Sequence, residues 1–391
     1  MRFTILTLGT RGDVQPYIAL GLGLQRAGHC VTLATPVEFE PWIRRYGLEH
    51  APVHLAPQAM LAYPEVRRVA RGRNFLRLLV TTRRVMGPLY PTLFHDYLLA
   101  SQSADVVIAA GTALGAYDCA EKLGIPLICA LLQPFPPTRG FPSFFLPPGP
   151  RLGGAFNWLS HLAFEQVLWL TYSDWSNAWR KRELGLSPLP FWGGSYRRIL
   201  SSRVPILFGY SSLVLPKPPE WAPWHHVTGY WELREPPDWQ PPEALQRFLD
   251  AGPPPVYVGF GSMVGDDSAA LTSVVIQALR RLGVRGVLLK GAAGLCADDS
   301  SGQLYLSDDL PHRWLFPRMA AIVHHGGSGT TGASLASGVP TLTVPFVLDQ
   351  FAWGDCISAR TCLAFNTGQR CRQVPKSRKS TVIRQWTSRG K

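Results

Sequence analysis

The residues with the clearest chemistry lie in one glycine-rich segment, VHHGGSGTTG, which runs from Val323 to Gly332. An apolar run precedes it and a helix-forming run follows it, so we expect a strand, a tight turn and the start of a helix. Free backbone N–H groups and the helix dipole make such a turn a binding site for an anion such as phosphate. His324, at the end of the predicted strand, can donate a hydrogen bond to a phosphate oxygen. The alternative is a turn whose glycines serve steric needs only.

Two other nucleotide-binding patterns fit this segment less well. Gly327, Gly329 and Gly332 satisfy GxGxxG, but a dinucleotide site also needs an acid at the end of the next strand. The predicted strand at 340–344 is followed by a proline and a phenylalanine, and the nearest acid is Asp349. A P-loop, GxxxxGK[ST], is absent from the sequence. An anion site is therefore favoured over a nicotinamide or flavin site.

The elements around this segment predict two parallel sheets. In the first half, buried-strand runs alternate with helical runs, which indicates crossover connections. The strand runs are residues 3–8, 30–34, 48–53, 106–110 and 127–131. A second alternation begins at residue 256, with strand runs at 256–260, 286–289, 304–306, 321–324 and 340–344.

A proline- and tryptophan-rich stretch at 216–242 separates the two alternations. We therefore predict an N-terminal domain at 1–215, a linker at 216–242 and a C-terminal domain at 243–354. Ligands of such sheets bind at the carboxyl ends of the strands, so a cleft between the two halves suits a two-substrate enzyme.

Charge and cysteine usage restrict the partners and the compartment. The net charge is +13, but residues 355–391 hold nine Lys/Arg and one acid and so supply +8 of it. The rest of the chain is not basic enough to indicate a nucleic-acid partner. The 7 cysteines show no CxxC or other metal-ligand spacing, which fits reduced thiols in the cytoplasm and no metal site.

Longer motifs carry a family resemblance. They are GTRGDVQPYIALGLGLQRAGHCVTLAT from Gly9, HVTGYW from His226, VYVGFGSM from Val256, and LPHRWLFPRMAAIVHHGGSGTTGASLASGVPTLTVPFVLDQ from Leu310. Through these motifs the sequence resembles the UDP-glycosyltransferase superfamily, and in particular its bacterial and fungal sterol glucosyltransferase-like branch. The resemblance ends near Gly354. It implies an α/β protein of the GT-B fold, with two Rossmann-like parallel-sheet domains facing each other across a cleft.

The resemblance also implies roles for the donor-site residues. His324 matches the histidine that contacts the diphosphate of a UDP-sugar, and Ser262 matches a hydroxyl near the distal phosphate. Asp349 and Gln350 match the pair that holds the sugar hydroxyls, although Asp349 is also placed to cap a helix. His312 and Trp314 match the stretch that packs near the uracil. A position in the hydrophobic core explains Trp314 equally well. The turn around the phosphates corresponds to Gly326, Gly327, Ser328, Gly329 and Thr330.

Asp13 matches the position of the general base. It lies in the loop after the first strand, where it would take the proton of the acceptor hydroxyl during an in-line displacement with inversion. An unperturbed aspartate is a weak base, so desolvation between the domains would help it. Asp13 can at the same time cap a helix that we expect to begin near Val14.

The resemblance implies transfer of a hexose, and more specifically of glucose, to a hydroxyl of a lipid, sterol-like or polyketide acceptor. The UDP-sugar is a co-substrate, and no cofactor or metal is expected. Acceptor loops at 56–73 and 133–150 are rich in apolar residues and favour a hydrophobic acceptor. The segment 152–172 predicts an amphipathic helix that can rest on a membrane surface rather than span it.

The end of the chain departs from the family. Residues 355–391 are basic, contain three cysteines and lack sustained helical periodicity, whereas relatives continue with further helices. We interpret this tail as the product of a frameshift that leaves the C-terminal domain incomplete, which would expose apolar surface. A basic extension that binds anionic lipid or nucleic acid is the other interpretation. The alternative function is then a catalytically impaired or non-catalytic nucleotide-binding product.

Overall fold

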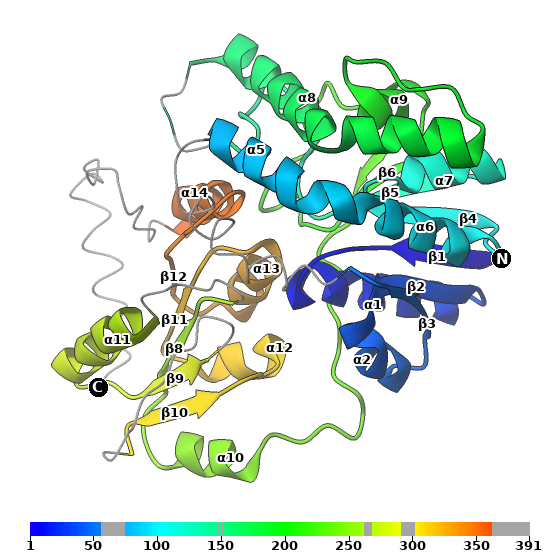
Figure 1. Cartoon of the computed structure of the whole chain (residues 1–391). Coiled ribbons are helices and arrows are strands. Elements are labelled where there is room, and N and C mark those ends of the chain that lie inside the picture. Colours follow the sequence, from blue (N-terminus) through cyan, green and yellow to red (C-terminus); the bar gives the residue numbers. More distant parts are fainter. Residues whose placement is uncertain (56–74, 147–148, 150–151, 262–267, 291–301, 362–391) are drawn as a thin grey trace.

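The computed structural model describes residues 1–55, 75–146, 149, 152–261, 268–290 and 302–361. Two α/β domains, each built on a parallel sheet, confirm the arrangement predicted from the alternating runs (Figure 1). Ser262, the loop at 56–73 and the tail from residue 362 onward lie outside the described residues.

The first sheet has seven strands in the order β3-β2-β1-β4-β5-β6-β7. Its strands are β1 (Arg2–Leu6), β2 (Cys30–Pro36), β3 (Glu49–Val53), β4 (Val106–Ala110), β5 (Leu127–Leu131), β6 (Ile206–Phe208) and β7 (His225–Val227). All five residues of β4 are buried, as expected for a central parallel strand covered on both faces. The strand β7 lies inside the segment predicted as linker and pairs with β6, so the first sheet reaches Val227.

Helices cover both faces of this sheet. In Figure 1, α1 (Arg11–Arg26) and α2 (Glu40–Arg45) lie on one side. The other side carries α5 (Phe75–Met86), α6 (Tyr90–Ser101), α7 (Ala116–Leu123), α8 (Gly154–Trp179) and α9 (Gly194–Ser201). The helix α1 begins at Arg11, three residues before the predicted start at Val14, because Thr10 and not Asp13 is its N-cap.

The second sheet has five strands in the order β10-β9-β8-β11-β12. They are β8 (Val256–Gly259), β9 (Gly286–Leu289), β10 (Leu304–Ser307), β11 (Ala321–His324) and β12 (Thr341–Thr343). Its helices are α10 (Glu243–Asp250), α11 (Ser268–Leu282), α12 (His312–Leu315), α13 (Ser328–Ser337) and α14 (Gln350–Thr361). The helix α14 runs across the boundary predicted at Gly354.

In both sheets the strand order reverses next to the first strand. The reversal falls between β1 and β4 in the first sheet and between β8 and β11 in the second. Loops leave such a switch point in opposite directions, which opens a crevice at the carboxyl ends of the strands. The loop after β1 leads to Asp13 in the first turn of α1, and the glycine-rich turn follows β11. The fold therefore places both predicted sites at switch points.

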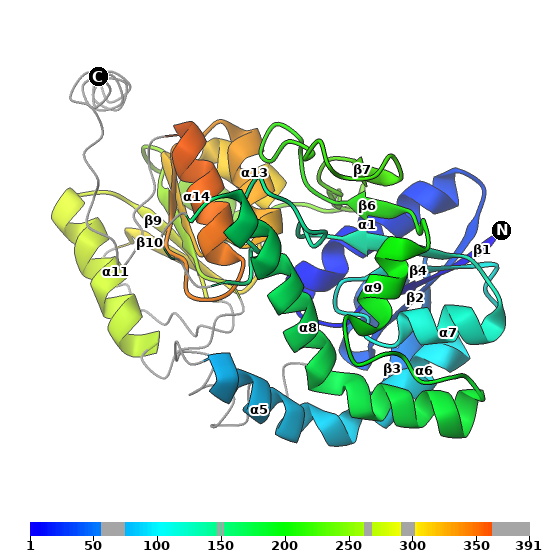
Figure 2. The same ribbon diagram turned by 90° about the horizontal axis from the view of Figure 1, so that it is seen from above.

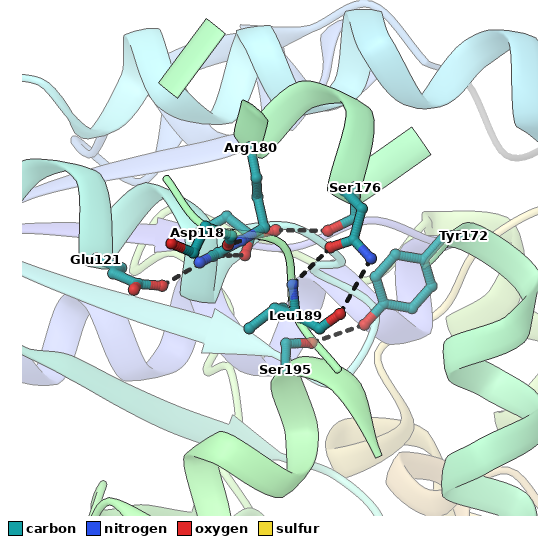
Figure 3. A network of polar contacts seen from close by, with 9 residues as sticks. Asp118, Glu121, Tyr172, Ser176, Arg180, Leu189 and Ser195 are labelled. Carbon is teal, nitrogen blue, oxygen red and sulfur yellow. Dashed lines mark hydrogen bonds and ion pairs between the residues drawn. The ribbon is translucent and has the colours of Figure 1, made fainter. Parts of the chain in front are cut away.

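A buried ionic network fixes the helices that flank the first domain (Figure 3). Arg180, just after α8, donates to Asp118 of α7 at 2.7 Å and to Glu121 at 2.8 Å. Ser176 donates to the other oxygen of Asp118 at 3.0 Å. Removing one partner of a fully buried pair costs about 3–5 kcal/mol, since it leaves a charge unpaired. This network therefore holds α7 and α8 in a fixed relation beside the sheet.

The long helix α8 does not have the character of a membrane span. Figure 2 shows it lying obliquely along the first domain, with its beginning near α14. Within the part of the chain that the structure describes, no helix has the length and hydrophobicity needed to cross a bilayer.

Candidate functional site

Asp13 is held in place by the start of its own helix. Its Oδ2 accepts hydrogen bonds from the backbone N–H of Thr10 at 2.8 Å and from the Thr10 hydroxyl at 3.1 Å. Gly9 has a φ of +147°, and a Cβ on it would lie 2.3 Å from that oxygen. A glycine is therefore required at residue 9 for the carboxylate to lie against the loop.

The environment of Asp13 makes it a better base than a solvated aspartate. Burial is the main cause that raises its pKa to about 6, the hydrogen bonds from Thr10 lower it, and the charge of Asp349 raises it further. Asp349 belongs to the second domain, so carboxylates from the two domains interact electrostatically. Asp13 is ionised at neutral pH and still has the basicity that proton abstraction needs.

The turn after β11 is shaped by close backbone packing. Gly326 has a φ of +88°, and a Cβ on it would lie 2.8 Å from the carbonyl oxygen of Gln350. The helix α13 starts at Ser328, whose hydroxyl donates to the carbonyl oxygen of Leu132 in the first domain at 3.3 Å. Gly329, in the first turn of α13, is exposed. The N-terminus of α13 therefore lies at the contact between the domains, where its free N–H groups can receive an anion.

His324, predicted to contact the diphosphate, lies buried beneath the turn after β11. Its side chain is fully buried, Nδ1 accepts from the backbone N–H of Gly326 at 3.0 Å, and Nε2 lies 3.4 Å from the Ser334 hydroxyl. Burial, and then the neighbouring His325 and His312, hold its pKa well below the usual range. Neutral His324 thus has both ring nitrogens engaged within its own domain and shapes the turn from beneath.

His325 is the ring that lies between the two glycine-rich turns, and the sequence analysis missed it. A Cβ on Gly261, after β8, would lie 2.8 Å from the His325 ring, and one on Gly327 would lie 2.6 Å from its Nε2. Its buried Nδ1 has no hydrogen-bond partner among the described residues. Burial lowers its pKa to about 4, and a hydrogen bond with the Gly259 backbone opposes that shift. The alternation of side chains along a strand was the available signal, because consecutive histidines point to opposite faces.

Asp349 and Gln350 lie at the start of α14. Asp349 Oδ2 accepts from Gln133 Nε2 at 3.0 Å and from Trp353 Nε1 at 3.1 Å. Gln350 Oε1 accepts from the backbone N–H groups of Phe346 at 2.8 Å and Val347 at 3.2 Å, which fixes the loop before the helix. Burial raises the pKa of Asp349, and its hydrogen bonds lower it. Asp349 directly precedes α14, and the two donors to its Oδ2 are side chains rather than backbone N–H groups of that helix.

The two residues predicted near the uracil differ in their surroundings. His312 Nε2 is 3.1 Å from the Tyr257 hydroxyl, and its ring stacks on Phe316 with centroids 4.5 Å apart. Burial lowers the pKa of His312 to about 4. Trp314 has aromatic and cationic partners already, Trp239 at 5.5 Å and Arg318 at 4.3 Å, which agrees with the structural interpretation. Among the described residues, no group of His, Cys, Asp or Glu is arranged to hold a metal ion.

Two family models match the chain. The Glycosyltransferase family 28 N-terminal domain matches residues 3–142. The Erythromycin biosynthesis protein CIII-like, C-terminal domain matches residues 299–372 and so continues past Gly354. The predicted resemblance to the glycosyltransferases of the GT-B fold, and to their sterol glucosyltransferase-like branch, is confirmed.

Curated relatives are named sterol 3-beta-glucosyltransferase. The protein from Neosartorya fischeri is 38% identical over 366 residues, and the one from Pichia angusta is 38% identical over 363 residues. The alignments cover 90% and 89% of this chain but 25% and 28% of those proteins. The chain thus spans about a quarter of the length of these relatives.

Solved structures share the fold at low sequence identity. The glycosyltransferase SnogD from Streptomyces nogalater has a TM-score of 0.56 at 18% identity, covering 99% of this chain and 95% of that one. The Streptomyces sp. SF2575 glycosyltransferase SsfS6, complexed with thymidine diphosphate, has a TM-score of 0.53 at 19% identity, covering 92% and 86%.

We expect substitutions of His325 and His324 to have different effects, one on ligand binding and the other on stability. His325→Ala should weaken the binding of UDP about tenfold or more with little loss of stability, because a charged phosphate loses one hydrogen bond. His324→Ala should instead lower the melting temperature, because Gly326 and Ser334 lose a buried partner. Calorimetric titration with UDP and thermal unfolding of both variants check this. Loss of UDP binding in a His324→Ala variant of unchanged stability would instead support the predicted contact of His324 with the diphosphate.

Proposed function

We propose that the protein transfers a hexose from a UDP-sugar to a hydroxyl of an apolar, sterol-like acceptor, with inversion at the anomeric carbon. The observation that carries this proposal is the pair of carboxylates, Asp13 and Asp349, which come from different domains and lie close enough for the charge of Asp349 to raise the pKa of Asp13. The relatives named sterol 3-beta-glucosyltransferase support glucose as the sugar and a sterol-like acceptor.

The donor would bind at the second domain. Backbone N–H groups at the start of α13 and the ring of His325 would face the diphosphate, and Asp349 with Gln350 would hold hydroxyls of the sugar. Helix-terminus amides in a water-poor site stabilise the charge that develops on a leaving diphosphate, so this chemistry requires no metal ion. The SsfS6 structure, which holds thymidine diphosphate, supports a nucleoside diphosphate as the ligand of this fold.

The acceptor would be activated by the first domain. Asp13 would take the proton of the acceptor hydroxyl as that oxygen attacks the anomeric carbon from the face opposite to the diphosphate. The carbon–oxygen bond to the diphosphate breaks as the new one forms, and UDP leaves with the electron pair. Because attack and departure occur on opposite faces, the configuration inverts.

The first domain also holds a small apolar cavity of ≈ 60 Å³ beside β4 and β5, with Ala110, Leu131, Phe135, Leu168, Tyr196 and Ile199 among its lining residues. Its apolar lining agrees with a hydrophobic acceptor, of which a volume of this size takes only a small group. Phe135 comes from the predicted acceptor loop at 133–150. The Tyr196 hydroxyl is buried without a hydrogen-bond partner among the described residues and offers a single polar contact to a bound molecule.

Asp13→Asn tests the proposed base. Asparagine keeps the shape and can still accept from Thr10, but it cannot take a proton. Transfer from UDP-glucose to a panel of apolar alcohols, sterols included, should fall by about 10²–10⁴-fold. UDP-glucose affinity, measured by calorimetry, should stay within a few-fold of wild type.

Asp105→Asn provides the matched control for that experiment. Like Asp13, Asp105 accepts a hydrogen bond from a backbone N–H group, that of Arg2 at 2.7 Å. Asp105 lies at the amino end of the same sheet, whereas Asp13 lies at the carboxyl end. Its variant should keep wild-type turnover. Near-full activity of Asp13→Asn would remove Asp13 from the mechanism, and no transfer by the wild-type protein to any alcohol would refute the proposed function.

We also propose that the first domain contacts a membrane surface through an aromatic edge formed by Phe156, Trp158, Leu159, Phe191 and Trp192. All five side chains are exposed, Phe191 and Trp192 by 62% and 65%. Gln166 of α8 donates to the Phe191 carbonyl at 3.0 Å, which holds the two parts of the edge together. Exposed aromatic rings favour the interface of a bilayer, and the exposed Arg197 and Arg198 of α9 nearby favour anionic lipid.

Vesicle binding tests this edge. The double variant Phe191→Ser, Trp192→Ser should reduce co-sedimentation with phosphatidylcholine–phosphatidylserine vesicles by at least about tenfold, since two large apolar side chains no longer insert. Val274→Ser, which removes a side chain of 63% exposure on α11, should leave binding unchanged. Equal sedimentation of the double variant and wild type would exclude this surface.

A further inference from the structure

The carboxylate of Asp349 is held from two sides, and only one of them is its own domain. Gln133, two residues after β5 in the first domain, donates through Nε2 to Asp349 Oδ2 at 3.0 Å. Trp353, one turn along α14, donates through Nε1 to the same oxygen at 3.1 Å. Two fixed donors on one oxygen set the plane of the carboxylate and therefore the direction of its other oxygen.

The position of Trp353 also depends on the first domain. Its side chain is fully buried and packs within the hydrophobic core of the N-terminal domain. Its ring meets Phe144 edge to face with centroids 5.0 Å apart, and Tyr210 with centroids 5.6 Å apart. Phe144 and Tyr210 both belong to the first domain, so the first domain packs against the indole that donates to Asp349, and the bond from Gln133 forms only when the domains are in contact.

The same edge of the first domain reaches the anion-binding turn. The carbonyl oxygen of Leu132, next to Gln133, accepts from Ser328 at the start of α13 at 3.3 Å. Two residues beyond Gln133, Phe135 lines the apolar cavity. A short segment of the first domain thus contacts the start of α13, the carboxylate of Asp349 and the proposed acceptor cavity.

We propose that Gln133 and Trp353 are positioning residues that orient Asp349 for the sugar of the donor. Asp349 then binds the sugar only while the two domains are in contact. This inference rests on the proposed function, because it takes Asp349 as the group that holds the sugar. The nucleotide itself is bound by the second domain and does not depend on this contact.

The hydrogen bonds from Gln133 and Trp353 affect both the ionisation and the orientation of the Asp349 carboxylate. A carboxylate that accepts a sugar hydroxyl must be ionised and correctly turned. Burial raises the pKa of Asp349, and the hydrogen bonds from Gln133 and Trp353 oppose that shift. Asp13 is the carboxylate of the first domain that interacts with Asp349, and the charge of Asp349 raises the pKa of Asp13. When the domains separate, Asp349 loses the donor from Gln133, and the Trp353 indole loses the first-domain rings that pack against it.

The test compares UDP with UDP-glucose in the variants Gln133→Met and Trp353→Phe. Each change keeps the approximate size of the side chain and removes one N–H donor. Hydrogen bonds to charged groups contribute about 1.5–3 kcal/mol, so calorimetry should show UDP-glucose bound about 10-fold more weakly or worse. UDP alone should bind as in wild type, and kcat/KM for UDP-glucose should fall by the same factor or more.

Two matched controls separate positioning from general damage. Gln166→Met removes a donor to the Phe191 carbonyl, and Trp169→Phe removes the bond from a buried indole to the Pro190 carbonyl at 3.1 Å. Both belong to the first domain and should leave the ratio of UDP-glucose to UDP affinity unchanged. If Trp353→Phe loses affinity for UDP as well, its fold is disturbed and Gln133→Met decides.

The outcomes distinguish this inference from the proposed function. Wild-type protein that binds no UDP-glucose overturns both. Wild-type protein that binds and transfers the sugar, together with a Gln133→Met variant whose affinity ratio equals that of wild type, overturns the positioning role alone. A shifted ratio in Gln133→Met with unshifted controls supports it.

Discussion

The contact between the carboxyl edges of the two sheets is the constraint on which the site depends. Each domain alone supplies half of the chemistry: the first holds Asp13, and the second holds the turn after β11 and Asp349. Burial at this contact raises the pKa of both carboxylates, and their mutual repulsion raises that of Asp13 further. Removal from water therefore turns an ordinary aspartate into a base suited to neutral pH.

Small residues make this proximity sterically possible. A side chain at residue 9 would collide with the Asp13 carboxylate, and one at residue 326 would collide with the backbone of Gln350. The turn is then supported from beneath by neutral His324, while His325 faces the space between the turns after β8 and β11. Farther from the site, the Asp118–Arg180 network holds α7 and α8 beside the sheet, where they help to enclose the apolar cavity.

The sequence predicted those features that depend on local patterns of residues. Long apolar runs identified the strands of both sheets from β1 to β5 and from β8 to β12, and the family motifs identified the fold. The three-residue strands β6 and β7 were missed, and β7 lies in a proline-rich stretch that indicated a linker, whereas β12, also three residues long, was predicted as part of the run 340–344. The choice between His324 and His325 depends on which face of β11 packs inward, which a single strand does not reveal. The bond from Gln133 to Asp349 joins residues 216 positions apart and follows only from the packing of one domain on the other.

The pH dependence of sugar transfer tests the central claim, that an ionised Asp13 made basic by burial drives the reaction. A carboxyl group of pKa about 6 is increasingly protonated below that pH, and the protonated form cannot accept the acceptor's proton. The measurement is kcat/KM for transfer from UDP-glucose to an apolar alcohol between about pH 5 and pH 8. The account predicts that the rate rises through about pH 6 to a plateau at neutral pH, and that this rise is lost in Asp13→Asn. A rate that is flat across this range in the wild-type protein, or the same rise in Asp13→Asn, would contradict it.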